Sequence, residues 1–176
     1  MQATLMNRTA AWTWRSLLIV WLVALGARTE AQIATKKPMP TPRMNPAAAV
    51  VGGKIYVLGG ISRQGLAVAT VEEYDPATDS WTRRAPMPTP RGMLAAASVG
   101  SIVYAIGGRS DSGGVLAVVE AYDVKTDQWR PVAPLQQARW GVMAAEAGGR
   151  LFALGGITGT GAARQSMVSV DVFSAP

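Results

Sequence analysis

The fold of this chain is decided by residues 87–129, which read MPTPRGMLAAASVGSIVYAIGGRSDSGGVLAVVEAYDVKTDQW. The stretch passes from a proline-rich turn through a small-residue run, an apolar run ending in two glycines, and a segment ending in Tyr-Asp to a tryptophan. The same features recur in phase 48 residues earlier, in residues 39–81. A further 48 residues after the central copy, Arg139 and the apolar run 151–156 repeat part of the pattern. Because fixed self-similarity is the signature of a repeat architecture, the chain from residue 33 onward is expected to consist of similar units.

Each unit is expected to form one blade of a β-propeller with four short antiparallel strands, since a period near 50 residues with strand-like segments is typical of blades. The small-residue run predicts the first strand. The apolar run predicts a second strand that neighbouring blades cover on both faces. The expected strands are 47–51, 54–58 and 71–74, then 94–99, 102–106 and 119–122, then 142–147, 150–154 and 168–173, with fourth strands around Trp81 and Trp129. In this permuted register the three units cover residues 33–80, 81–128 and 129–176.

The third unit departs from the pattern after its second strand. Its loop 157–166 is longer, Phe173 replaces the tyrosine of the other units, and no fourth strand is expected after it. Residues 33–37, in contrast, align with the fourth strand around Trp81 and predict an outer strand without a blade of its own. Propellers have 4 to 8 blades. Two explanations stay open: two copies form a homodimer that completes a six-bladed ring by exchanging these ends, or the chain is a fragment of a longer propeller.

The repeated features resemble the kelch motif: two glycines after an apolar strand, then a tyrosine with an acid two positions before it, then a tryptophan. In the central unit these are Gly107-Gly108, Glu120, Tyr122 and Trp129, and the resemblance covers nearly all of residues 33–176. It implies an all-β fold of kelch-type propeller blades, of the galactose-oxidase-like superfamily. Kelch propellers carry binding, scaffolding and catalytic functions on one architecture, so the resemblance by itself selects none of them.

The N-terminal region has a different composition from the repeats. Arg8 and Arg15 precede an uncharged stretch from Ser16 to Ala27, and small residues follow at its end. This layout predicts a secretory signal peptide over residues 1–31, cleaved after Ala31, and hence a secreted or periplasmic protein with no membrane association after cleavage. The alternative is an uncleaved anchor, although the apolar run is well short of the roughly 20 residues that a spanning helix needs.

The composition excludes several classes of chemistry. The chain has no cysteine and no histidine, which excludes disulfides, thiol catalysis, serine-histidine triads and histidine-ligated metals. It also excludes the copper site that the galactose oxidase group uses, and no cofactor is expected. The net charge is +6 for the whole sequence, and the basic residues after residue 31 are spread over the repeats, so nucleic acid is not an expected partner.

The candidate binding residues lie at the predicted rim of the propeller. Arginines that recur at the entry to each first strand are expected either to form a ring for anionic groups or to bond carbonyls and acids such as Glu72 or Glu120 of a neighbouring blade. Trp140 breaks the repeat beside one of these arginines, and an indole there suits stacking on a sugar or an aromatic group. Glu146 is the one acid on the first strands. The full set of candidates is Arg43, Arg91, Arg139, Trp140, Glu146 and, in the loops after the glycine pairs, Arg63 and Arg109, with Ser62, Ser110 and Asp111 beside them.

Three functions are compatible with these features. The first is an exported interaction module that binds a protein or carbohydrate ligand with its propeller loops and performs no catalysis. The second is an enzyme similar to kelch-type sialic-acid mutarotases, in which Glu146 and Arg139 would act on the sugar. The third is a truncated propeller without an independent function.

Overall fold

The computed structural model describes residues 33–174, and the residues from Thr35 onward belong to one compact unit. The predicted signal peptide, residues 1–31, lies outside the described residues. Within them, the regular structure consists of β-strands and one short 3₁₀ turn at Gly161–Ala163. No helix in residues 33–174 is long and apolar enough to cross a bilayer.

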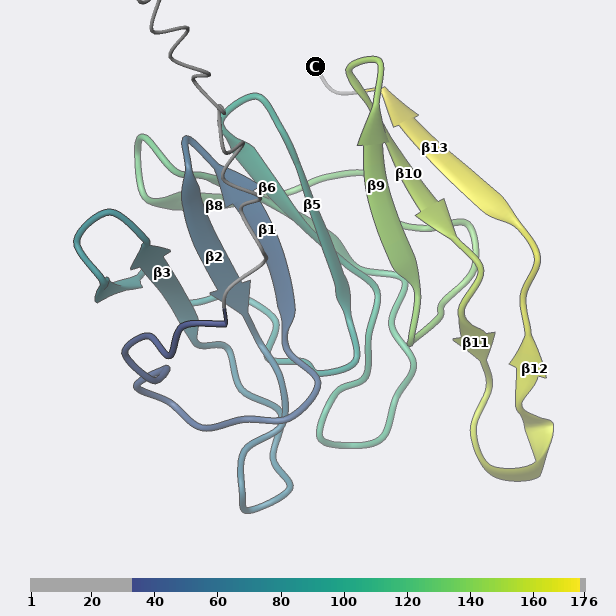
Figure 1. The fold of residues 1–176 in the computed structure, drawn as a ribbon. Helices are drawn as coiled ribbons and strands as arrows, with labels where there is room; N and C mark the ends of the chain where they lie inside the picture. Colours follow the sequence, from purple (N-terminus) through teal and green to yellow (C-terminus); the bar gives the residue numbers. More distant parts are fainter. Residues whose placement is uncertain (1–32, 175–176) are drawn as a thin grey trace, which may run out of the picture. The chain divides into compact units, whose positions relative to one another are not determined.

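Three of the four antiparallel sheets in residues 33–174 correspond to the three predicted blades (Figure 1). This confirms the all-β fold of four-stranded kelch-type blades, about three of them in the chain. Blade 1 contains β1 (Ala47–Val51), β2 (Lys54–Leu58), β3 (Val71–Asp75) and β4 (Ser80–Arg84), and blade 2 contains β5 (Ala95–Val99), β6 (Ile102–Ile106), β7 (Val119–Asp123) and β8 (Gln128–Pro131). Blade 3 contains β9 (Met143–Ala147), β10 (Arg150–Leu154) and β13 (Val170–Ser174), and its longer loop holds the two-stranded hairpin of β11 (Ile157–Thr158) and β12 (Gln165–Ser166).

The first strands of the blades, β1, β5 and β9, lie side by side (Figure 1). Their sequences AAAVV, AAASV and MAAEA consist mainly of alanine. Small side chains let three strands converge, because a larger residue on each would fill the same space. A hydrogen bond also joins β5 to β1, since the hydroxyl of Ser98 donates to the carbonyl of Val50 at 2.7 Å.

The second strands carry the apolar core between blades. Every residue of β6 from Val103 to Ile106 is buried, as the uninterrupted apolar run predicts for a strand covered on both faces. Tyr56 of blade 1 packs toward Tyr122 of blade 2, with ring centroids 6.0 Å apart. Two core clusters result, one between blades 1 and 2 and one between blades 2 and 3.

The recurring arginines belong to this core and are not exposed at the rim. Arg91 is 0% exposed and donates to the carbonyls of Thr89 at 2.8 Å and Ala105 at 3.0 Å, and to Glu120 at 2.5 Å. Burial lowers the pKa of Arg91, and the hydrogen bond to the Glu120 carboxylate opposes this shift. The two equivalent pairs are Arg43 with Glu72 at 2.6 Å and Arg139 with Asp171 at 2.9 Å.

The expectation of an arginine ring open to anionic ligands is therefore not met. Each guanidinium joins the segment before the first strand to the third strand, β3, β7 or β13, of its own blade. The partner acid is on the same blade and not on the neighbouring one, because the entry segment lies beside the third strand of the sheet that it begins. The carboxylates already neutralise these cations, so they are structural.

A second repeated contact joins the segment after the outer strand of one blade to the next blade. The hydroxyl of Tyr122 donates to Asp127 Oδ1 at 2.5 Å, and this carboxylate also accepts from the backbone N–H of Ala85 at 2.9 Å. The indole of Trp129 donates to the carbonyl of Ala85 at 2.9 Å and lies 5.0 Å from the Tyr122 ring. The segment that leaves blade 1 is thus fixed to blade 2.

Residues 33–37 differ from the expected outer strand. They form no strand in the structure, because among the described residues no strand lies beside them to complete a hydrogen-bonded ladder. Lys37 nevertheless occupies the place that Ala85 has one blade later: its N–H donates to Asp79 at 3.1 Å and its carbonyl accepts from Trp81 at 3.0 Å. The predicted strand 168–173 is also shifted, since β13 begins at Val170 after the longer loop.

We predict that Glu120→Ala lowers the free energy of unfolding by about 3–5 kcal/mol, because it leaves the buried Arg91 guanidinium without its counter-charge. Urea denaturation followed by circular dichroism measures the change. Glu146→Ala is the matched control, since Glu146 is exposed and its removal is expected to change the free energy by less than about 0.5 kcal/mol. Equal effects of the two substitutions would contradict a structural role for the pair.

We predict that the contact between Tyr122 and Asp127 makes stability depend on pH. The hydrogen bond from Tyr122 lowers the pKa of Asp127 below its ordinary value, and the N–H of Ala85 adds to the shift. A lowered pKa in the folded state stabilises the fold above the unfolded pKa of about 3.9, and the contribution is lost as the pH falls through the folded pKa. Asp127→Asn is therefore less stable than the unchanged protein at neutral pH, and the difference narrows below about pH 4. Urea titrations at several pH values test this, and a difference that stays constant with pH would refute it.

Candidate functional site

The segments before the first strands of the three blades meet at one mouth of the arc. A shallow cavity of about 280 Å³ there is lined by two neighbouring residues from each of these segments: Asn45 and Pro46, Met93 and Leu94, Trp140 and Gly141. Asn45, Met93 and Gly141 hold the same repeat position. A backbone ladder joins them, because the N–H of Met93 donates to the carbonyl of Asn45 at 3.1 Å and the N–H of Gly141 donates to that of Met93 at 2.8 Å.

Met93 holds an unfavourable backbone conformation in this ladder. Its φ is 53°, and the equivalent residues Asn45 and Gly141 have φ of 50° and 60°. Asparagine and glycine adopt this left-handed region readily, whereas an unbranched apolar residue does so at a cost of order 1–3 kcal/mol. The ladder between blades imposes the conformation. Strained residues of this kind gather at binding sites, and Met93 lines a second cavity as well.

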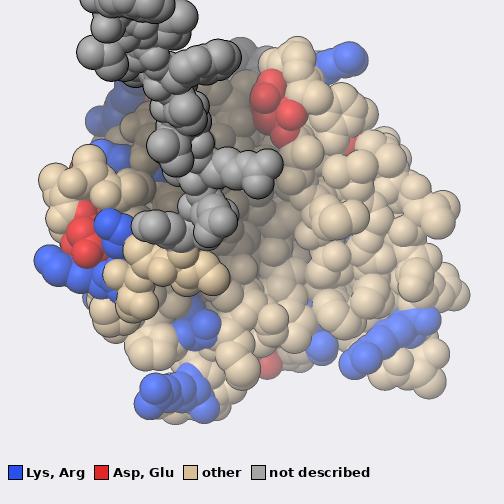
Figure 2. Space-filling model, viewed as in Figure 1, with Lys and Arg blue, Asp and Glu red and all other residues tan. Residues whose placement is uncertain are grey.

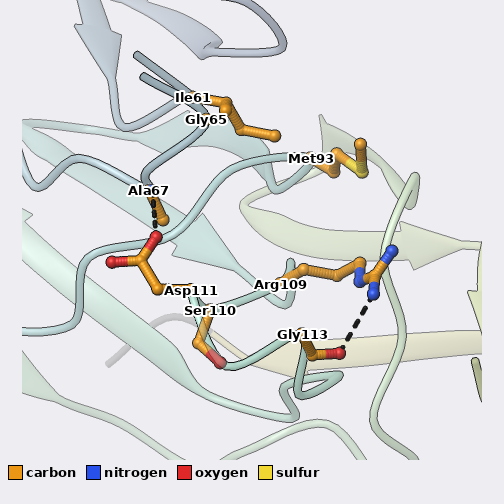
Figure 3. A pocket seen from close by; sticks show the side chains of 8 residues that line it. All are labelled: Ile61, Gly65, Ala67, Met93, Arg109, Ser110, Asp111 and Gly113. Atoms are coloured by element: carbon orange, nitrogen blue, oxygen red, sulfur yellow. Dashed lines mark hydrogen bonds between the residues drawn. The ribbon is translucent and has the colours of Figure 1, made fainter. Parts of the chain in front are cut away.

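This second cavity, which we call the loop pocket, lies between the loop joining β2 to β3 and the loop joining β6 to β7 (Figure 3). Its volume is about 180 Å³. Residues from blade 1 and Met93 supply its apolar side, and the loop of blade 2 supplies its polar side. The lining residues are Ile61, Gly65, Ala67, Met93, Arg109, Ser110, Asp111 and Gly113.

Hydrogen bonds hold the two loops of the loop pocket together. Asp111 accepts from the backbone N–H of Ala67 and so joins the loop of blade 2 to that of blade 1. Arg109 exchanges two backbone bonds with Gly92, at 2.9 and 3.1 Å, and its side chain donates to the carbonyl of Gly113 at 3.1 Å. The Nε of Arg109 is buried and has no partner in the part of the chain that the structure describes. The contacts between the two loops therefore preform the pocket, and one buried donor beside it has no hydrogen-bond partner among the described residues.

Trp140 lies beside this arginine and not beside Arg139, which is buried. Its indole is 5.6 Å from the guanidinium of Arg109 and 5.4 Å from that of Arg164, distances typical of cation–π contacts. Its backbone pairs with Ile157 at the start of the hairpin in blade 3. The prediction that the indole lies beside the Arg139 guanidinium was thus wrong. The guanidiniums of Arg109 and Arg164 already contact the indole ring, which leaves less of its face for a sugar.

The repeat explains why a pocket opens between blades 1 and 2. The position of Trp140 is held by Gly92 in blade 2, and a Cβ on Gly92 would lie only 2.6 Å from the side chain of Ile61. The absence of a side chain there makes room for Ile61, which packs against the backbone of Gly92 and lines the pocket. At the corresponding position, blade 3 has a large indole that contacts Arg109.

The remaining candidates are placed apart from the loop pocket. Arg63 is exposed in the loop joining β2 to β3 but does not line the pocket. Glu146 lies toward the opposite end of β9 from the mouth, on a shallow surface formed by the first strands with Val50 and Ser98, and accepts from the N–H of Gly149 at 2.8 Å. Glu146 and Arg139, which the mutarotase alternative would need together, are therefore separate, and each is engaged in its own blade.

Sequence reasoning identified the polar side of the loop pocket, Arg109, Ser110 and Asp111, but missed its apolar side. Met93 could have been identified from the sequence, because it occupies a repeat position that is asparagine or glycine in the other two units. Nothing in the sequence marked Ile61 and Ala67. In residues 33–174, no cluster of three or more acidic, cysteine or histidine side chains is placed to hold a metal ion.

Comparisons with known proteins agree with this architecture. Residues 15–156 match the family described as the KLHDC2/KLHL20/DRC7 Kelch-repeats domain. The match begins inside the predicted signal peptide, and the comparisons give no support to export. Human Kelch-like protein 30 is 49% identical over 51 residues, which are 29% of this chain and 8% of that protein. F-box/kelch-repeat protein At5g26960 of Arabidopsis thaliana is 52% identical over 46 residues, which are 26% of this chain and 11% of that protein.

The chain thus spans only a small part of the length of these two relatives. The family match, in contrast, covers most of the chain and agrees with the three sheets, the paired glycines and the repeated Tyr-Asp and Trp contacts. Kelch domains are generally protein-interaction modules. The chain belongs to the KLHDC2/KLHL20/DRC7 family of Kelch-repeat domains.

Proposed function

We propose that the chain is a binding module that captures a segment of a partner protein in the loop pocket. The observation that supports this most directly is the pocket itself: two loops from different blades, joined through Asp111 and Ala67, with an apolar side and a polar side. Loops positioned by a rigid scaffold are where binding residues are usually found.

The size of the pocket favours a protein ligand over a free small molecule. Pockets that enclose drug-sized ligands measure roughly 300–1,000 Å³, and the loop pocket measures about 180 Å³. It is therefore suited to one side chain of a polypeptide, with the rest of the ligand lying across the mouth. The apolar groups of Ile61 and Met93 suit an aliphatic or aromatic side chain, and the donors of Arg109 suit a carboxylate or carbonyl next to it.

Carbohydrate is the weaker alternative. An indole that stacks on a sugar needs a free ring face, and Trp140 contacts two guanidinium groups of its own chain. We therefore propose that Trp140 positions Arg109 beside the pocket.

We predict that Arg109→Gln weakens peptide binding by about tenfold, corresponding to about 1.4 kcal/mol. Peptides selected from a phage-displayed random library against the full chain are the probes, and calorimetry measures their affinity. Arg83→Gln is the matched control, since Arg83 is exposed on β4 in the outer part of blade 1, and it should leave affinity unchanged.

Two results would contradict the proposal. One is equal affinity of the unchanged chain and Arg109→Gln for every selected peptide. The other is that the peptide library yields no binder whereas a glycan array does. This result would indicate that the chain recognises carbohydrate.

We also propose that the chain is exported and cleaved after Ala31. The support is the sequence pattern of residues 1–31 alone. The expected mature protein begins at Gln32, which mass spectrometry of the product from a secreting host identifies. Ile19→Arg interrupts the apolar run and should keep the chain inside the cell. Recovery of the unchanged chain inside the cell with residues 1–31 intact would contradict export.

A further inference from the structure

Three residues that depart from the repeat meet at one indole ring. Arg109 holds the repeat position of Ile61 in blade 1 and of Ile157 in blade 3, at the same backbone bridge of each blade. Trp140 stands where the other units have methionine and glycine, and Arg164 lies in the loop that is longer in blade 3 than in the other two blades. Both guanidiniums contact the indole of Trp140. Because residues that every blade needs recur with the repeat, a cluster built from exceptions is a candidate for recognition.

The hairpin of β11 and β12 fixes Arg164 beside this indole. The N–H of Trp140 donates to the carbonyl of Ile157 at 3.0 Å, and the N–H of Ile157 donates to the carbonyl of Trp140 at 2.8 Å. Gly159 lets the hairpin turn tightly, because its φ is 72° and a Cβ there would overlap the carbonyl oxygen of Ala163. The backbone of blade 3 therefore holds Arg164 and Trp140 together and directs both toward Arg109.

Neither guanidinium is neutralised by an acid in residues 33–174. The Nη2 of Arg109 donates to the carbonyl of Gly113, whereas its buried Nε has no partner there, and Arg164 is exposed. The cations that form ion pairs in this range are Arg43, Lys54, Arg84, Arg91 and Arg139. Two positive charges thus lie beside one ring, and an anion placed there is attracted by both.

The loops at this end of the blades contain few acids. The charged residues in the three loops that join the second strand of each blade to its third are Arg63, Arg109, Arg164 and Asp111. Asp111 is engaged by the N–H of Ala67, and the side chain of Arg109 extends away from it (Figure 3). Figure 2 shows basic side chains over the loop joining β2 to β3 and over the hairpin of blade 3, with little red between them. This end of the molecule therefore attracts negatively charged groups.

The aspartates of the repeat lie at the other end of the blades. They occupy the turns between the third and fourth strands of blades 1 and 2: Asp75, Asp79, Asp123 and Asp127. The uneven distribution of charge means that an acidic ligand is attracted to the loop pocket and not to the opposite mouth.

We propose that the polypeptide segment captured in the loop pocket is acidic, and that Arg109 and Arg164 bind its carboxylate groups. Guanidinium groups bind carboxylates through paired N–H donors. Ile61 of blade 1 contacts the apolar side chain of the segment, and the two arginines lie toward blade 3. The acidic residue therefore lies on the blade 3 side of the apolar one. Since this inference rests on the proposed function, its test separates the failure of one from the failure of the other.

The first test uses peptides selected from a phage-displayed random library against the full chain. The selected sequences should be enriched in aspartate or glutamate near an apolar residue. Replacing the acidic residue of a selected peptide by its amide should weaken binding by about tenfold, measured by calorimetry. Added salt should weaken binding of the acidic peptide more than binding of its amide analogue, because salt screens the charges.

The second test identifies the arginine of the hairpin. Arg164→Gln should weaken binding of the acidic peptide by about fivefold and leave binding of its amide analogue unchanged. Arg164→Glu should bind a peptide with lysine in the acidic position more tightly than the acidic peptide. Arg150→Gln is the matched control, because Arg150 is also exposed and its guanidinium also lies over a ring, 5.8 Å from that of Phe152, at the other end of β10. This control should leave both affinities unchanged.

The outcomes distinguish the two proposals. If the amide analogue binds as tightly as the acidic peptide while Arg109→Gln still weakens both, the acidic ligand is wrong and the proposed function stands. An equal loss of both peptides in Arg164→Gln would overturn the pairing of Arg164 with a carboxylate. If no library peptide binds, or if Arg109→Gln affects none, both proposals fail. Circular dichroism checks the folding of each variant, and the comparison of the acidic peptide with its amide needs only the unchanged chain.

Discussion

A blade of this chain has two apolar faces, and neither can be covered from within the blade. The second strand shows the constraint most plainly, since β6 is buried along Val103 to Ile106 by blade 1 on one side and blade 3 on the other. Burial of apolar surface supplies most of the stability of such a domain. Each blade therefore depends on its neighbours, and the alanine-rich first strands permit this dependence because they let the blades approach closely.

The polar contacts follow from the same constraint. The segment that enters each blade is covered by the core, so its backbone and the guanidinium of Arg91 need partners that water cannot supply. Glu120 and the carbonyls of Thr89 and Ala105 provide them. A cation so enclosed stabilises the blade and is not available to a ligand. The groups left for recognition are in the longer loops, which contacts between blades hold in place.

Most of the fold, but only part of the candidate site, could be predicted from the sequence. The second strands of all three blades lie where the apolar runs place them, because a run of that length bounded by glycine has few other conformations. Arg109 and Asp111 were recognised as loop residues, whereas the contact of Trp140 with Arg109 was not. Equivalent positions of the repeat have surroundings that depend on what the next blade places against them. Gly92 makes room for the side chain of Ile61, and Trp140 fills the equivalent position with a ring.

The sequence by itself determined the blade, since the strand pattern, the glycine turns and the Tyr-Asp and Trp positions are local features that recur with a fixed period. Only the tertiary structure decided which polar groups are buried and which are free. The guanidiniums of Arg91 and Arg109 are chemically identical and differ in the packing around them, because burial is set by residues far apart along the chain. Met143, Phe152 and Val172 of blade 3 likewise came onto one face only when the strands were paired, because a face of a sheet takes every second residue of each strand.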